Sequence, residues 1–275
     1  MKNFESDIYE NLAIDQAYIT AEKTLARERI PLGDFKDLYG EENIVQDEKY
    51  VAEMERKFRV QEDPSRAHTE KLATIFECVL HEQAELNEWL GPNVTTIKTS
   101  RFDDVKNGVD SVAELRETES SASYLALAID ATFSSDTQKK FDRIKEELVQ
   151  GKLATVKYFI SDHMNIRGEL GQIPRVVIGA DVATVKELSE LWLERENKKL
   201  AIHPIQFQIL EEIIMQLETF GAYAAKLKKH NITAVYEKSA KLFREILREK
   251  EKHIPDSGMR DRVFEDIQAN LRIFI

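Results

Sequence analysis

The segment 124–133 constrains the fold of this chain more than any other part of the sequence. It places Leu125, Leu127 and Ile129 among alanines, without the regular polar alternation of a half-exposed strand. Short apolar runs of this kind are typical of strands that are buried on both faces. The sequence therefore predicts a sheet that is covered on both sides.

Helical and strand-like patterns alternate around this segment. The expected elements are a helix over 69–90, strands over 94–98, 109–116 and 124–133, a helix over 136–150, and strands over 154–160 and 175–179, with a turn at 168–171. A helix that follows a strand commonly crosses back, so that the next strand joins the same sheet. We therefore expect an α/β fold with one mixed sheet over about 64–180, flanked by helices.

The two ends of the chain carry opposite net charges. Residues 1–63 have 16 acidic and 9 basic side chains, whereas residues 221–252 have 4 acidic and 9 basic ones. The ends should therefore bind different partners or contact each other.

Both ends also show helical periodicity. Near the N-terminus it covers 7–29 and 47–59, and after residue 182 it is interrupted near Pro204, His230 and Pro255. We therefore expect three regions. They are an acidic helical extension (1–64), an α/β core (65–181) and a helical C-terminal region (182–275).

Composition excludes several classes of site. The net charge of -11 argues against a chain that binds phosphate backbones over its whole surface, so any nucleic-acid site must be local. A single cysteine, Cys78, excludes an internal disulfide and a cysteine-based zinc site, and the six histidines show no ligand spacing. No apolar run approaches the roughly 18 residues of a membrane helix, and the start lacks an apolar signal segment. We expect a soluble cytoplasmic protein.

Two aspartates, Asp110 and Asp130, lie at the ends of predicted strands. Asp110 follows the turn signal Asn107-Gly108, and Asp130 interrupts the most apolar strand of the chain. A charge in that strand is costly unless it is paired or bound to a metal ion. If the two strands are neighbours, both carboxylates can reach one point, where they repel each other unless a cation lies between them. Mg²⁺ or Mn²⁺ is the implied ligand, although an aspartate at such a place also commonly caps a turn or a helix.

On these residues the sequence resembles the PD-(D/E)XK nuclease superfamily, the restriction-endonuclease-like proteins. Residues 108–110 (Gly-Val-Asp) resemble the first acidic motif and residues 129–132 (Ile-Asp-Ala-Thr) the second, within a core that covers about 64–160. The resemblance implies a restriction-endonuclease-like mixed sheet and metal-dependent cleavage of phosphodiester bonds. It also implies that Asp110 and Asp130 bind Mg²⁺ or Mn²⁺.

The resemblance implies two further catalytic groups. The first is an acid on the first core helix, for which Glu77 and Glu82 compete, and we choose Glu77. The second is a lysine, but Thr132 stands where the family has it. Some members supply this lysine from the following helix, where Lys140 lies on the apolar side and Lys139 points away. A lysine pair on a helix is also commonly a solvated surface.

A basic stretch near the C-terminus provides the local positive surface that the overall charge lacks. Lys241, Arg244 and Arg248 follow helical spacing and could face phosphates together, with Lys139 as a further contact. Alternatively, the stretch faces the acidic N-terminal helices, within one chain or across a homodimer.

The leading hypothesis from the sequence is a metal-dependent nuclease that acts on DNA, with Asp110, Asp130, Lys140 and Glu77 as catalytic residues. The alternative is a catalytically inactive protein of the same fold, which binds nucleic acid or a protein partner and has lost the lysine at Thr132. A third hypothesis is a helical interaction protein whose sheet is only a scaffold, and it predicts no binding of divalent ions.

Overall fold

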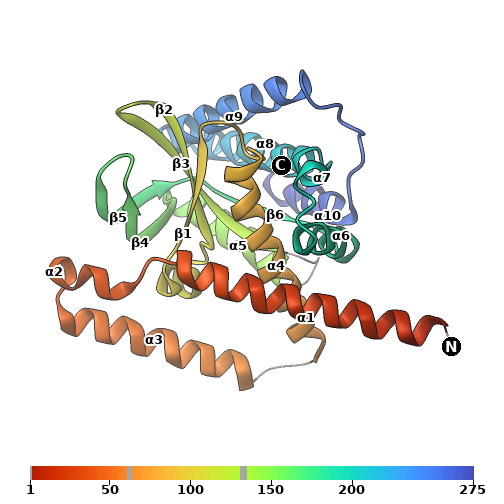
Figure 1. The fold of residues 1–275 in the computed structure, drawn as a ribbon. Coiled ribbons are helices and arrows are strands. Elements are labelled where there is room, and N and C mark those ends of the chain that lie inside the picture. Colours follow the sequence, from red (N-terminus) through yellow and green to blue (C-terminus); the bar gives the residue numbers. More distant parts are fainter. Residues whose placement is uncertain (1, 61–63, 131–134) are drawn as a thin grey trace.

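The computed structural model describes the backbone of residues 2–60, 64–130 and 135–275, and the side chains of residues 12–57, 67–127 and 138–275. Its main sheet has four strands in the order β1-β2-β3-β6 (Figure 1). The pairs β1–β2 and β2–β3 are antiparallel, and β6 runs parallel to β3. These strands are β1 (Val94–Lys98), β2 (Ser111–Thr118), β3 (Ser121–Asp130) and β6 (Arg175–Gly179). The predicted α/β class with a mixed sheet is confirmed.

Helices precede the sheet, connect its strands and follow it. They are α1 (Lys2–Glu28), α2 (Lys36–Tyr39), α3 (Glu41–Val60), α4 (Pro64–Leu86), α5 (Ser135–Gln150), α6 (Val182–Leu193), α7 (Asn197–Ala201), α8 (Ile205–Lys226), α9 (His230–Glu251) and α10 (Arg262–Asn270), with helical turns η1 (Leu32–Phe35), η2 (Asp103–Asn107) and η3 (Leu271–Phe274). α4 packs on β1 and β3, α5 and α8 pack on β6, and α1 crosses α4 (Figure 1). The three breaks expected in the C-terminal region are confirmed. Within the described residues, no helix is long and apolar enough to cross a membrane.

Two further strands form a separate sheet. They are β4 (Ala154–Ser161) and β5 (Ile166–Ile173), an antiparallel pair. The expectation of a single sheet is therefore wrong, because the strand after α5 pairs with β5 and only β6 returns to β3. Glycines and charged residues interrupt β5 and hide its strand pattern. Residues 168–171, expected to be a turn, lie inside β5, where Gly168 pairs with Phe159, and the turn falls at 162–165.

The main sheet is buried on both faces, as the apolar β3 predicts, but by different partners. Leu125 and Leu127 belong to a large core that the sheet shares with α1, α4, α5 and α8. Ala126 belongs to a smaller core, where it packs with Val156 and Phe159 of β4. Successive residues of β3 therefore point into different cores, as the alternation of side chains along a strand requires.

The acidic N-terminal segment is joined to the large core. Ala17, Ala21 and Leu25 of α1 lie in the same hydrophobic cluster as Leu72 and Ile75 of α4. The boundaries that we expect near residues 64 and 181 stay predictions.

Two expected boundaries shift in ways that matter for packing. The helix expected over 69–90 ends at Leu86, and Glu88 then adopts a left-handed backbone conformation (φ 52°) that turns the chain. Leu86, a member of the predicted apolar stripe, is consequently 65% exposed. The second strand begins at Ser111 instead of residue 109, and the end expected for the third strand, 131–133, lies outside the described residues.

The outer edge of β6 is hydrogen-bonded by side chains of α8 in place of a neighbouring strand. Gln216 accepts from the Val177 N–H (2.8 Å) and donates to the Val177 carbonyl (2.6 Å). Glu212 accepts from the Gly179 N–H (3.0 Å), and burial raises the pKa of this glutamate well above its ordinary value. These contacts stabilise the edge, because buried backbone groups without partners cost free energy.

Gln216→Ala should destabilise the protein by about 2 to 4 kcal/mol, since it leaves a buried N–H and a buried C=O without their partner. Urea unfolding followed by circular dichroism measures the change. Gln150→Ala, at the exposed end of α5, is the control and should alter the free energy of unfolding by less than about 0.5 kcal/mol. Equal stabilities of the two variants would contradict this role of α8.

Candidate functional site

A buried aspartate fixes the turn that carries the candidate site. Asp103 begins η2 and is fully buried. Its carboxylate accepts four hydrogen bonds, from Ser100 Oγ (2.7 Å), Asn107 Nδ2 (2.7 Å) and the N–H groups of Lys157 (2.7 Å) and Tyr158 (3.0 Å). Because these bonds occupy both oxygens, Asp103 anchors the turn to β4 and is not a ligand for a bound ion.

Asp110 follows this turn directly before β2. The turn ends at Gly108, whose left-handed conformation (φ 60°) favours glycine. The Asp110 N–H then donates to the Leu127 carbonyl (3.0 Å), which fixes the aspartate beside β3. The turn signal Asn107-Gly108 is thus confirmed, although the turn is π-helical.

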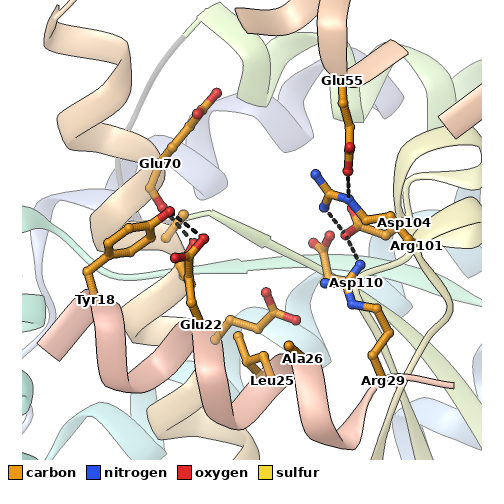
Figure 2. Close-up of a pocket in the computed structure, with 13 residues that line it drawn as sticks. Tyr18, Glu22, Leu25, Ala26, Arg29, Glu55, Glu70, Arg101, Asp104 and Asp110 are labelled. Atoms are coloured by element: carbon orange, nitrogen blue, oxygen red, sulfur yellow. Dashed lines mark hydrogen bonds and ion pairs between the residues drawn. The ribbon is translucent and has the colours of Figure 1, made fainter. Parts of the chain in front are cut away.

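Asp110 lines a pocket of about 560 Å³ between α1, α4 and the turn (Figure 2). Its lining is dominated by carboxylates. The acidic residues are Glu22, Glu55, Glu70, Glu77, Asp104 and Asp110, and the basic residues are Arg29 and Arg101. Three of these acids come from α1 and α4, so the two long helices form an acidic wall opposite the turn.

Asp104 is held by two arginines on one side of this pocket. It accepts from Arg29 (3.1 Å) and from Arg101 (2.7 Å), and Arg101 also binds Glu55 of α3 (2.6 Å) (Figure 2). Burial acts to raise the pKa of Asp104. The charges of Lys98, Arg101 and Arg29 outweigh that effect and hold the pKa below its ordinary value. Asp104 is therefore a compensated carboxylate, and it links the turn to the N-terminal helices.

Asp110 has the opposite electrostatic environment. Burial, assisted by the charges of Asp104 and Glu77, raises the pKa of Asp110 to about 7. The charges of Lys140 and Lys98 act against this rise without cancelling it. The protein therefore disfavours the charged form of Asp110, and carboxyl groups perturbed in this way concentrate at functional sites.

Lys98 is a site residue that the sequence analysis missed. It ends β1 with a fully buried side chain, forms an ion pair with Glu77, and donates to the Asp110 carbonyl (2.9 Å). One lysine therefore connects the helix glutamate to the backbone of the strand aspartate. A lysine at the end of the apolar run 94–98 is the signal that could have identified it.

Lys139 and Lys140 line a second pocket, of about 470 Å³, next to the first. The two pockets share Glu70, Arg101, Asp104 and Asp110. Lys140 is half-buried and Lys139 is exposed. Both lysines of α5 lie near Asp110, whereas the helical pattern predicts that Lys139 points away.

Asp130 is placed only by its backbone. β2 and β3 are neighbours, as the metal hypothesis requires, and Asp130 pairs with Gly179 at the end of β3, three residues beyond Leu127. Its side chain lies outside the described residues, as does Thr132. The distance between the Asp110 and Asp130 carboxylates therefore stays a prediction.

The remaining predicted residues lie elsewhere. Glu82 accepts from Trp192 Nε1 (2.7 Å) and does not line the pocket of Asp110. Lys241, Arg244 and Arg248 belong to α9, on the opposite side of the molecule from α1 and α3 (Figure 1). Arg244 pairs there with Glu218. Within one chain, the described parts of α1 and α3 therefore do not face the basic stretch of α9 (Figure 1).

The residues around Asp110 have the donor chemistry of a magnesium or manganese site. Carboxylate oxygens are the ligands that these ions prefer, and Mg²⁺ commonly takes one or two of them, with waters and substrate phosphates in the other positions. Among the described residues, no three acidic, histidine or cysteine side chains are close enough together to hold an ion by themselves. A divalent-ion site at Asp110 and Glu77 therefore stays a prediction.

No protein-family model, curated protein or solved structure matches this chain. The interpretation of the pocket depends on its geometry and on the sequence.

Asp110→Asn should stabilise the protein at alkaline pH. The unfolded chain releases the Asp110 proton near pH 4 and the folded protein only near pH 7, so wild-type stability falls as the pH rises through this interval. Asparagine removes that fall. Urea unfolding gives the free energy of unfolding of the variant minus that of wild type. This difference should be about 2 to 4 kcal/mol more favourable to the variant at pH 8 than at pH 4. Asp142→Asn, on the exposed side of α5, is the control, and a gain for Asp110→Asn that does not depend on pH would contradict the raised pKa.

Proposed function

We propose that this protein is a metal-dependent nuclease that hydrolyses phosphodiester bonds, with DNA as its substrate. One observation carries the proposal: Asp110 lines two pockets, one together with Glu77 of α4 and the other together with Lys140 of α5. These are three of the four catalytic residues that the PD-(D/E)XK resemblance implies. Residues 77, 110 and 140 are distant in sequence, so their presence around two pockets that share Asp110 is not a consequence of local structure.

The carboxylates of Asp110 and Glu77 would hold the ion, together with Asp130 from the end of β3. Binding of a cation removes the repulsion that Asp104 and Glu77 impose on the ionised Asp110. When bound, Mg²⁺ or Mn²⁺ supplies Lewis-acid polarisation of the scissile phosphate and makes water a stronger nucleophile.

The two lysines of the site have separate tasks in this proposal. Lys140 places an ammonium group beside Asp110, where it orients the attacking water or offsets the negative charge that develops on the phosphate. Lys98 acts indirectly, because its ion pair with Glu77 fixes the orientation of that carboxylate. Hydrolysis joins the water oxygen to phosphorus, breaks the bond to the leaving oxygen, and transfers a water proton to the products.

A catalytically inactive protein that binds nucleic acid or a protein partner is the second candidate. The observation that favours it is the internal pairing of the pocket. Lys98 already neutralises Glu77, and Arg29 and Arg101 already neutralise Asp104. Carboxylates with internal cations need no external ion.

A cleavage assay on single- and double-stranded DNA and RNA, with Mg²⁺ or Mn²⁺, tests the proposal. Glu77→Gln, Asp110→Asn and Asp130→Ala should each lower the rate by about 10² fold or more. Glu82→Gln, on the same helix as Glu77 but outside the pocket, should cleave at the wild-type rate. Wild-type protein that cleaves none of these substrates with either ion would contradict the proposal and favour the inactive alternative.

The two lysines of α5 give a second test of the same reaction. Lys140→Ala should lower the rate by about 10² to 10⁴ fold, because it removes a charge positioned beside Asp110. Lys139→Ala should have a much smaller effect, since its side chain is exposed. Equal losses in both variants would indicate that the pair only binds substrate, and full activity in both would exclude a catalytic lysine on α5.

A further inference from the structure

We call the two pockets that share Asp110 the first lobe and the second, basic lobe, because they differ in charge. The lobe between α1 and α4 has six acidic and two basic lining residues, whereas the lobe beside α5 has five basic and three acidic ones. The basic residues of the second lobe are Arg101, Lys139, Lys140, Arg143 and Arg175. The first lobe repels a polyanion and the second attracts it, so the charges favour approach to Asp110 along α5.

Arg175 is a buried cation at the inner end of the basic lobe. It begins β6, and its side chain is only 4% exposed. It donates to the Gly108 carbonyl (3.3 Å) and pairs with Glu147 (3.2 Å), while its Nε has no partner among the described residues. A guanidinium has five N–H donors, so Arg175 keeps donors for another acceptor.

Arg143 lies next to Arg175 and shares the same counterion. It binds the same Glu147 oxygen (3.3 Å) and donates to the Lys106 carbonyl (3.2 Å). Two guanidinium groups share one contacting carboxylate in a partly desolvated position, and Asp110 adds a negative charge nearby, so the basic residues of the lobe keep an excess of positive charge. An oxyanion in the lobe would compensate that charge.

Gly108 lies against both guanidinium groups. A Cβ at this position would lie 2.8 Å from Arg143 Nη1 and 3.4 Å from Arg175 Nη1, closer in the first case than side chains tolerate. The absence of a side chain lets both guanidinium groups reach the turn that precedes Asp110. The turn therefore places the carboxylate and the two arginines in fixed relation.

We propose that Arg143 and Arg175 form a subsite for a non-scissile phosphate of a polynucleotide, next to the phosphate that lies at Asp110. This proposal rests on the proposed function, since it assigns the polynucleotide to the same pocket. A phosphodiester fits the lobe because bidentate arginine contacts match its oxygen geometry. The described lining has no aromatic ring for a base to stack on, so the subsite binds the backbone and not the bases.

Fluorescence anisotropy with a labelled DNA oligonucleotide in EDTA tests this subsite separately from catalysis. Arg143→Gln should weaken binding about tenfold and should lower the salt dependence by about one phosphate contact. Arg175→Lys, which keeps the buried charge but loses the planar donors, should weaken binding as well. Arg195→Gln, an exposed arginine at the end of α6 outside the pocket lining, is the control and should bind like wild type.

Three results would overturn the subsite. Unchanged binding by Arg143→Gln is the first. The second is a larger loss with Arg248→Gln, which would move the polynucleotide to α9. The third is inorganic phosphate that binds as tightly as the oligonucleotide, which would make this a site for a free small anion. Asp110→Asn keeps both arginines and should still bind DNA in EDTA, so loss of cleavage in that variant reports on the proposed function and not on this subsite.

Discussion

The hydrogen bonds of the Asp103 carboxylate to the Lys157 and Tyr158 amides hold the functional region together. They join the π-helical turn after β1 to the separate sheet of β4 and β5. The positions of Asp104 and Asp110 follow from that attachment, because both lie on or directly after the turn. A charge buried with several amide donors is well stabilised, whereas the same charge without them would be costly. The turn is therefore held by its hydrogen bonds to β4, which lie outside the pocket.

Asp103 and Asp104 lie in this turn and Asp110 follows it, and the three carboxylates have different surroundings. Asp103 is satisfied by donors of the fold, and Asp104 by Arg29 and Arg101, so the pKa of Asp104 stays low despite burial. Asp110 is buried like Asp104, but the charges of Asp104 and Glu77 act on it, and its pKa is raised to about 7. Of these three aspartates, Asp110 is the one whose raised pKa motivates the proposed cation site. The two pockets that Asp110 lines differ in charge, and the proposed polynucleotide site uses the basic one.

The sequence was informative where the signal is local. The order of helices and strands, the turn before Asp110 and the place of Glu77 on a core helix follow from periodicity and turn chemistry. Lys98 and Asp104 could not be assigned, because their roles depend on partners that the fold supplies from distant elements, such as Arg29 on Asp104. β5 was missed for another reason: it is a polar, partly exposed strand with glycines, and only its pairing with β4 identifies it.

The central claim is that Asp110 belongs to a cation site, and calorimetric titration with Mn²⁺ at pH 8 tests it most directly, because Asp110 is then ionised. Wild-type protein and Glu82→Gln should bind Mn²⁺ with equal affinity. Asp110→Asn should bind it at least about tenfold more weakly while remaining folded. Equal affinity of wild type and Asp110→Asn, or no binding by wild type, would contradict the account.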